Sequence, residues 1–455
     1  MRTSRTAAIS VSVVITAMMG AALAAPAVAV DPEPTQEPRV TVEYFPEPGG
    51  EGRRTEVPVN TEAVTGRAAA RSMAATAETT DGEVGELSVT GSSANRLDVV
   101  IVGDGYTADQ QDAFHTAAAT KWADITGIEP YSSYQGLMNV WTVDAVSAES
   151  GITGDPTADV TKDTALGSYF WCADTERLVC ADIDKVASYA AKAPEADLVI
   201  VVSNSTKYGG AGYSGLEAEG YPFDGVSTLS SDNAQSSLIA AHEIAHSVGL
   251  LADEYTYDSY GTWSEGEPAD INSSTFTTEQ MAANRTKWFR WLGETDPTGG
   301  TVGTFEGSSY YPYGIYRPTS NSLMRALNIS DFNLPGREAM IAGFYREANA
   351  LSSKVSTDSQ VLRTSRIKVS QAELTGLAAP ELRWYVDGVQ IERAQGLTTV
   401  IPAALGIPAD GRTHTVTVKS GDRTKSIRDP KVLAEATESL TWTVKASGRK
   451  SQKHH

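Results

Sequence analysis

The residues that most often bind metals or form crosslinks are scarce in this sequence. The 455-residue chain has only two cysteines and six histidines. In an exported chain, an even count of cysteines at short spacing predicts a disulfide, and Cys172–Cys180 would close one small loop. Metal ligation by these cysteines is the alternative, but no CxxC spacing supports it.

Basic residues are also in deficit. The 37 lysines and arginines face 57 acidic residues, which gives a formal net charge of −20. Nucleic acid and anionic membranes both demand a basic surface, so neither is expected as the main partner.

Long apolar runs are absent except at the N-terminus. Two arginines precede an apolar run from residue 7 to about residue 25, and AVA at 27–29 provides a small-residue cleavage site. The pattern predicts a signal peptide over residues 1–29, whose removal leaves a secreted, extracellular protein with no membrane insertion. A membrane anchor is the alternative. The Ala-rich run and the acidic, Pro-containing sequence after it favour the signal peptide, and no later run is long enough to span a bilayer.

The length exceeds what one hydrophobic core usually supports, so two or more domains are expected. Residues 30–93 are rich in Pro, Gly, Glu, Thr and Ala, and we interpret them as an N-terminal extension or propeptide that ends in a linker. Its one strand-like stretch is 40–45, and the linker begins near residue 67.

Strand and helix patterns alternate through residues 94–350, which predicts an α/β domain. Residues 351–447 show short alternating runs separated by turns, which predicts an all-β Ig-like sandwich. The basic, polar residues 448–455 predict a disordered tail. Within the α/β domain, buried strands are expected at 97–102, 139–146 and 197–203, and helices after residue 107 through about 122 and at 181–192.

One predicted helix carries a metal-binding pattern. His242 and His246 are four residues apart, so both imidazoles project from one face and can reach one Zn²⁺ at about 2.0–2.1 Å. Glu243 lies beside them, placed to hold and deprotonate a water molecule at the metal. A chance match is the alternative. Two of only six histidines at this spacing, with a glutamate after the first, favour the metal site.

The surrounding residues support a helix. Asp232 and Gln235 resemble a capping box at its start, and Gly249 fits a C-terminal stop. Four apolar residues recur at helical spacing and are expected to face the core: Leu238, Ala241, Ala245 and Val248.

The third metal ligand must come from outside the helix. A catalytic zinc takes three protein ligands and keeps one position open. Because no histidine follows the helix before His414, a carboxylate just downstream is expected. Asp253 is the first candidate and Glu254 the second; the one that does not bind would orient an imidazole.

The run HEIAHSVGLLADEY at 242–255 resembles the zinc signature of the IgA-peptidase family of metallopeptidases. Further blocks match in the expected order, and the resemblance covers about residues 95–346. It implies a zincin-like, metzincin-type catalytic domain with one catalytic zinc ion and a protein or peptide substrate. The further blocks are VVIVGDGYT at 99–107, EPY at 129–131 through Asn139, SAESG at 147–151, NSTKYGG at 204–210, GIYRP at 314–318 and NSLMR at 321–325.

Two details follow from this resemblance. Metzincins place their third ligand six residues after the second histidine, where this chain has Ala252, and Asp253 comes one residue later. The SLMR run at 322–325 looks like the methionine turn, so Met324 is expected to form an apolar floor beneath the histidines. An ordinary core methionine is the alternative.

Two further roles are open. The run YGGAGY at 208–213 is a candidate edge strand for an extended substrate, with a Gly-rich loop as the alternative. Tyr311 or Tyr316 is a candidate hydrogen-bond donor to the oxyanion, with simple packing as the alternative.

These patterns predict a secreted zinc-dependent endopeptidase in which Glu243 is the general base. A secreted binding or adhesion protein with a structural or vestigial zinc site is the alternative. The motifs around the metal do not identify the substrate.

Overall fold

The structure is a computed structural model that describes residues 39–58, 81–223 and 225–446. The predicted signal peptide, residues 1–29, and the predicted tail, residues 448–455, lie outside the described residues. Among the described residues, no helix is both long and apolar enough to cross a bilayer.

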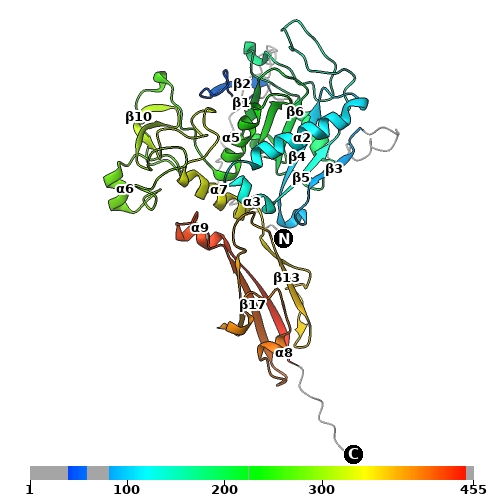
Figure 1. Cartoon of the computed structure of the whole chain (residues 1–455), viewed down its shortest axis with the longest axis vertical. Coiled ribbons are helices and arrows are strands. Elements are labelled where there is room, and N and C mark those ends of the chain that lie inside the picture. The colour runs from blue at the N-terminus through cyan, green and yellow to red at the C-terminus, as the bar shows by residue number, and fades with distance from the viewer. Residues whose placement is uncertain (1–38, 59–80, 224, 447–455) are drawn as a thin grey trace, which may run out of the picture. The chain divides into compact units, whose positions relative to one another are not determined.

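An eight-stranded sheet organises the α/β region (Figure 1), with the strand order β2-β1-β7-β8-β6-β4-β5-β3. Its parallel centre has every residue buried, as expected for β-branched strands covered by helices on both faces. The predicted strands at 97–102, 139–146 and 197–203 are confirmed with small shifts. The four central strands are β4 (Leu97–Asp104), β5 (Met138–Val143), β6 (Leu198–Ser203) and β8 (Val226–Ser230).

Alternate residues of the central strands point to opposite faces and enter different cores. Val99 and Ile101 pack with α2 (Gln111–Thr126) and α5 (Ser236–Gly249), whereas Val100 and Val102 pack on the side of α4 (Ile183–Ala190). The helices expected through about residue 122 and at 181–192 are therefore present, as α2 and α4. The sheet is a buried layer between helices, and α5 lies against one of its faces.

Antiparallel strands extend this sheet at both ends. At one end β8 pairs with β7 (Gly210–Tyr213), β7 with β1 (Arg39–Tyr44), and β1 with β2 (Arg53–Pro58). At the other end β3 (Val84–Ser88) pairs with β5. Parts of the predicted extension and linker are thus strands of the main sheet, rather than a separate layer.

Helix α5 differs at both ends from its prediction. It begins at Ser236 after Gln235, which makes no side-chain cap, so the predicted capping box with Asp232 is wrong. It ends at Gly249, but Leu250 is the residue in the left-handed conformation, at φ 50°. Gly249 has a packing role instead, because a Cβ there would overlap the sulfur of Met340 on α7 (Leu334–Glu347). As predicted, Ala241, Ala245 and Val248 are buried, and Leu238 packs at the edge of the same core.

The remainder of the α/β region consists of short elements and loops. The predicted disulfide between Cys172 and Cys180 is present. The short elements are α3 (Tyr131–Tyr134), α6 (Thr278–Asn284), β9 (Phe305–Ser308) and β10 (Tyr311–Arg317).

After residue 350 the chain forms two small sheets around a core of their own. Trp384 and Trp442 stack at its centre, with ring centroids 6.1 Å apart. The Ig-like assignment of this all-β region stays a prediction. One sheet has the order β11-β13-β16 and the other β12-β18-β17-β14-β15; their strands are β11 (Leu351–Ser353), β12 (Val361–Leu362), β13 (Ile367–Gln371), β14 (Glu381–Val386), β15 (Val389–Gln390), β16 (Thr399–Val400), β17 (Thr413–Gly421) and β18 (Thr437–Lys445), with α8 (Pro402–Leu405) and α9 (Pro430–Glu435) between them.

Asp422 links this region to the helices of the α/β region. Its Oδ2 atom accepts hydrogen bonds from the hydroxyls of Tyr134, at 2.6 Å, and Tyr345, at 3.1 Å. Asp422 is buried, and its carboxylate satisfies two tyrosine hydroxyls that would otherwise lack these bonds.

Candidate metal centre

His242 and His246 project from one face of α5, and each is oriented by a main-chain carbonyl. The Nδ1 atom of His242 lies 2.9 Å from the carbonyl oxygen of Leu323, and that of His246 lies 2.6 Å from the carbonyl of Leu251. Since a carbonyl only accepts, each Nδ1 carries a proton, which leaves Nε2 as the nitrogen of each ring that can bind a metal ion. The two Nε2 atoms lie 3.0 Å apart.

Two carboxylates complete this cluster. Oδ1 of Asp253 lies 3.1 Å from Nε2 of His242 and 3.3 Å from Nε2 of His246. Glu43, on β1, places Oε1 3.2 Å from His242 Nε2 and Oε2 3.5 Å from His246 Nε2. One ligand atom from each of the four residues lies within 4.8 Å of all the others.

The spacing of these atoms fits a tetrahedral metal ion. Ligand atoms at about 2.0–2.1 Å from a tetrahedral zinc lie about 3.3–3.4 Å from one another. The separations among Nε2 of His242, Nε2 of His246 and Oδ1 of Asp253 are 3.0, 3.1 and 3.3 Å, close to that value. The two oxygens of Glu43 lie 3.2 and 3.5 Å from one imidazole nitrogen each. Imidazole nitrogens and carboxylate oxygens are also ordinary zinc ligands. The four residues therefore fit a zinc ion by both chemistry and spacing.

The charge balance also calls for a cation at this point. Burial lowers the pKa of His242, but the carboxylates of Glu43 and Asp253 reverse this effect and raise it to about 10. Burial lowers the pKa of His246 as well, but Asp253 and then Glu43 reverse this effect and raise it well above its usual value. The two imidazoles in turn hold the pKa of buried Asp253 well below its usual range. The two carboxylates thus favour positive charge at this point, which a bound metal ion would also supply.

Asp253 is held from both its backbone and its side chain. Its carbonyl accepts from the amide of Ser309 at 2.8 Å, and its Oδ2 accepts from the hydroxyl of Tyr310 at 2.5 Å. Ser309 and Tyr310 have φ values of 49° and 72°, a left-handed conformation that costs about 1 kcal/mol or more for each non-glycine residue. The strained turn brings Tyr310 over the carboxylate, and the amide of Tyr310 is tied to the carbonyl of Tyr255.

Glu254, the second candidate for third ligand, points away from the imidazoles. Its fully buried carboxylate accepts hydrogen bonds from Asn272, Asn333 and Ser322. Glu254 therefore does not orient an imidazole as expected. The carbonyls of Leu323 and Leu251 orient the two rings instead. Glu254 instead ties α5's downstream loop to the segment that contains Met324, whose carbonyl also accepts from the Glu254 amide at 2.8 Å.

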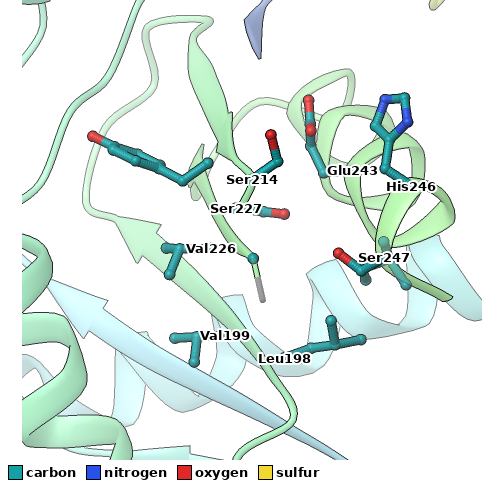
Figure 2. Close-up of a pocket in the computed structure, with 11 residues that line it drawn as sticks. Leu198, Val199, Ser214, Val226, Ser227, Glu243, His246 and Ser247 are labelled. Carbon is teal, nitrogen blue, oxygen red and sulfur yellow. The ribbon is translucent and has the colours of Figure 1, made fainter. Parts of the chain in front are cut away.

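Glu243 lies on α5 next to the cluster formed by Glu43, His242, His246 and Asp253. Figure 2 shows its carboxyl group and the His246 ring projecting from the helix beside a pocket, with Ser214 and Ser227 nearby. Gly212 of β7 makes this position possible, because a Cβ at residue 212 would overlap the carboxyl of Glu243. Burial, followed by the charge of Glu43, raises the pKa of Glu243 to about 8. Its Oε1 atom has no hydrogen-bond partner among the described residues.

The other predicted residues take varied places. Met324 is buried in the core that includes α5, and its role as a floor for the histidines stays a prediction. Tyr311 packs edge-on against Trp263, and Tyr316 pairs through its backbone with Ser274. Tyr310, the residue immediately before Tyr311, contacts the cluster through its hydrogen bond to Asp253.

Sequence reasoning missed Glu43 and Tyr310. Glu43 lies in the stretch predicted as a strand at 40–45, but nothing local marks one acidic side chain in a strand as facing a metal. Tyr310 is followed by a second tyrosine, Tyr311, and the sequence does not show which of the two faces the cluster. The strained turn at residues 309–310 decides this in the structure.

Comparison with known protein families matches residues 86–299 and 294–344 to the family described as IgA Peptidase M64. The matched stretch includes the central strands, α5, Asp253 and Met324, and it spans more than half of the chain. Comparison with curated proteins found no significant match. Mixed α/β content with several sheets fits a peptidase catalytic domain. The resemblance in the sequence motifs is thereby confirmed, and the chain belongs to the IgA peptidase M64 family of metallopeptidases.

Proposed function

We propose that the protein is a secreted zinc-dependent endopeptidase. The observation that carries this proposal is the convergence of His242, His246 and Asp253 on one point beside the carboxyl of Glu243. We further propose a zincin-like catalytic domain followed by an Ig-like sandwich, with residues 1–29 removed on export. The disulfide is compatible with an oxidising, extracellular location.

In this proposal three side chains hold the ion. His242 and His246 would bind through Nε2, and Asp253 would bind through Oδ1. When bound, zinc supplies Lewis acidity, which polarises a carbonyl group and makes water acidic near neutral pH. The carbonyls of Leu323 and Leu251 keep both imidazoles in the tautomer that ligates, and Tyr310 orients the carboxylate.

Glu243 would act as the general base and then as the general acid. It would take a proton from the attacking water and pass it to the leaving amine. A buried carboxyl oxygen without a competing hydrogen bond supports this role, since it is free to accept that proton. Gly212 leaves the space in which the carboxyl moves between these two partners.

Strand β7 is the proposed docking edge for substrate. It carries the run at 210–213 that the sequence singled out, and one of its sides pairs with β8. Its other side, which pairs with β1 in this structure, would pair with an extended peptide by main-chain hydrogen bonds when β1 is displaced. Because Gly212 on this strand abuts Glu243, a peptide paired with β7 would pass directly in front of the base.

The experiment is a paired measurement of zinc content and proteolysis on wild type and Glu243→Gln. Unfolded casein is the substrate, and new N-termini are identified by mass spectrometry, which detects slow turnover. Both proteins should bind one zinc per chain, but only wild type should produce chelator-sensitive cleavage. Equal absence of cleavage across a broad peptide library in every variant, with zinc bound, would contradict the proposal.

A further inference from the structure

The substrate edge of the sheet is covered by the chain itself. β1 pairs antiparallel with β7 through Val42 opposite Tyr213 and Glu43 opposite Gly212. β2 then pairs with β1 over six residues, so the two strands form a hairpin outside β7. We refer to residues 39–58 as the N-terminal hairpin. It lies where an extended peptide would have to pair.

One side chain of the hairpin, Glu43, lies beside the two histidines. Because Glu43 is paired with Gly212, it lies on the strand directly in front of Glu243. Its two carboxylate oxygens lie 3.2 and 3.5 Å from the Nε2 atoms of His242 and His246. The side chain is 7% exposed, and Oε1 has no hydrogen-bond partner among the described residues. A buried carboxylate of this kind needs a cation as its partner.

Apolar packing anchors the first strand of the hairpin. Val40, Val42 and Phe45 are buried, and the Phe45 ring meets the His242 imidazole edge-on at 5.0 Å. Gly52 lets the second strand approach, because a Cβ there would overlap both Glu43 and Tyr255.

Polar contacts anchor the second strand and the turn. Arg54 donates to the hydroxyl of Tyr310 at 2.9 Å and lies over its ring at 4.9 Å. Arg53 lies over the ring of Tyr257 at 5.5 Å. In the turn, the carbonyl of Gly50 accepts from the amide of Leu327 at 3.1 Å. Arg54 thus reaches the same tyrosine that holds Asp253.

We propose that the N-terminal hairpin is an autoinhibitory segment that occupies the substrate edge and supplies Glu43 as the fourth ligand of the metal ion. This inference rests on the proposed function. A catalytic zinc must keep one position open for water and substrate, and Glu43 fills that position. The hairpin strand simultaneously takes the main-chain groups of β7 that a substrate would use. Full activity therefore requires displacement of the hairpin from β7, and removal of the Glu43 carboxylate should relieve part of the inhibition.

The test compares Glu43→Ala and Glu43→Gln with Glu56→Gln in the full chain. Glu56 lies on the same hairpin, but its side chain is exposed and forms an ion pair with Arg39 at 3.8 Å. Each protein is loaded with Co²⁺, and its visible absorption spectrum and its affinity for acetohydroxamic acid are measured. These readouts do not depend on catalysis.

Both Glu43 variants should change the Co²⁺ spectrum and bind acetohydroxamic acid about tenfold more tightly or better, because the competing ligand is gone. Glu56→Gln should match wild type in both measurements. Identical spectra and hydroxamate affinities in wild type and both Glu43 variants would overturn the proposal. Loss of metal from both variants would also overturn it, because Glu43 would then be a permanent ligand.

Peptide hydrolysis separates this proposal from the proposed function. With zinc bound, Glu43→Ala should cleave a quenched-fluorescence peptide library faster than wild type, and Glu56→Gln should not. If the spectral and hydroxamate effects appear while no variant cleaves any peptide, the hairpin does cover the metal and the endopeptidase assignment fails.

Discussion

The hydroxyl of Tyr310 donates a 2.5 Å hydrogen bond to Oδ2 of Asp253, whose Oδ1 lies 3.1 Å from Nε2 of His242. One carboxylate therefore connects a strained turn to the proposed metal ion. The arrangement leaves Oδ1 free to bind the metal and prevents the side chain from rotating away. Tyr310 is thus a positioning residue for Asp253, the proposed third ligand.

Removal of the Tyr310 hydroxyl should weaken zinc binding. In Tyr310→Phe the carboxylate of Asp253 loses its orienting donor, and such a loss typically costs about 10- to 100-fold in metal affinity. Competition with a chromogenic chelator measures the zinc dissociation constant. Tyr311→Phe is the matched control, because Tyr311 packs against Trp263. Equal zinc affinity in the two variants would show that the Tyr310 hydroxyl does not position Asp253 for metal binding.

A methyl group at residue 212 should block catalysis while the metal stays bound. In Gly212→Ala the new Cβ would overlap the Glu243 carboxyl, which must then move away from its position beside the two histidines. We expect peptide hydrolysis to fall by about 100-fold, the scale of a general-base contribution, with one zinc still bound. Gly266→Ala is the control, since nothing lies near a Cβ at that position. Unchanged kcat/KM in Gly212→Ala would show that the base does not need this space.

The metal-free protein should lose stability as the pH rises. The pKa of His242 is raised from 6.5 to about 10, so its contribution to folding is complete below 6.5 and is lost as the pH rises to 10. The pKa of Glu243 is raised from 4.5 to about 8, so Glu243 also binds its proton more tightly in the folded protein than in the unfolded chain. The free energy of unfolding therefore falls as the pH rises from 4.5 to about 8. Both effects have the same sign.

Thermal unfolding of chelated and zinc-loaded protein, from about pH 6.5 to about pH 9, measures this effect. The Tm of the chelated protein should fall across the interval. The Tm of the zinc-loaded protein should fall less, because the ion replaces the protons in the cluster. A chelated protein whose Tm rises with pH would contradict the charge balance described for the cluster of Glu43, His242, His246 and Asp253.

Loss of the Asp422 carboxylate should destabilise the fold without affecting the metal. Asp422→Ala leaves the buried hydroxyls of Tyr134 and Tyr345 without this acceptor, which typically costs about 1–3 kcal/mol for such a group. Denaturant unfolding measures the change, and the zinc dissociation constant should be the same as in wild type. Asp358→Ala, at an exposed residue of the same region, is the control. Equal unfolding free energies in the two variants would mean that Asp422 does not link the two regions.

The parts of this molecule that local spacing determines were predictable from the sequence. Buried strands such as 97–104 are continuous β-branched runs, and the spacing of His242, Glu243 and His246 places all three on one helix. The scarcity of histidine pointed to a carboxylate as third ligand, and Asp253 lies at the cluster. The disulfide followed from having just two cysteines.

The rest depends on tertiary contacts that no local pattern encodes. The pairing of β1 with β7 brings Glu43 to the two histidines, and strand alternation alone does not reveal which residue Glu43 will face. The capping box expected at Asp232 and Gln235 failed because the helix begins one residue after Gln235. The helix does end at Gly249 as expected, but Leu250 adopts the left-handed conformation, and a Cβ at residue 249 would overlap the sulfur of Met340.

The most direct test of the central claim is the zinc content and peptide hydrolysis of Glu43→Ala and of the double variant Glu43→Ala/Glu243→Gln, measured side by side. The first substitution frees the fourth metal position, and the second removes only the base. Both proteins should contain one zinc per chain, and only Glu43→Ala should cleave peptides in a chelator-sensitive manner. Equal cleavage by the two proteins would contradict the assignment of Glu243 as the base of a zinc peptidase.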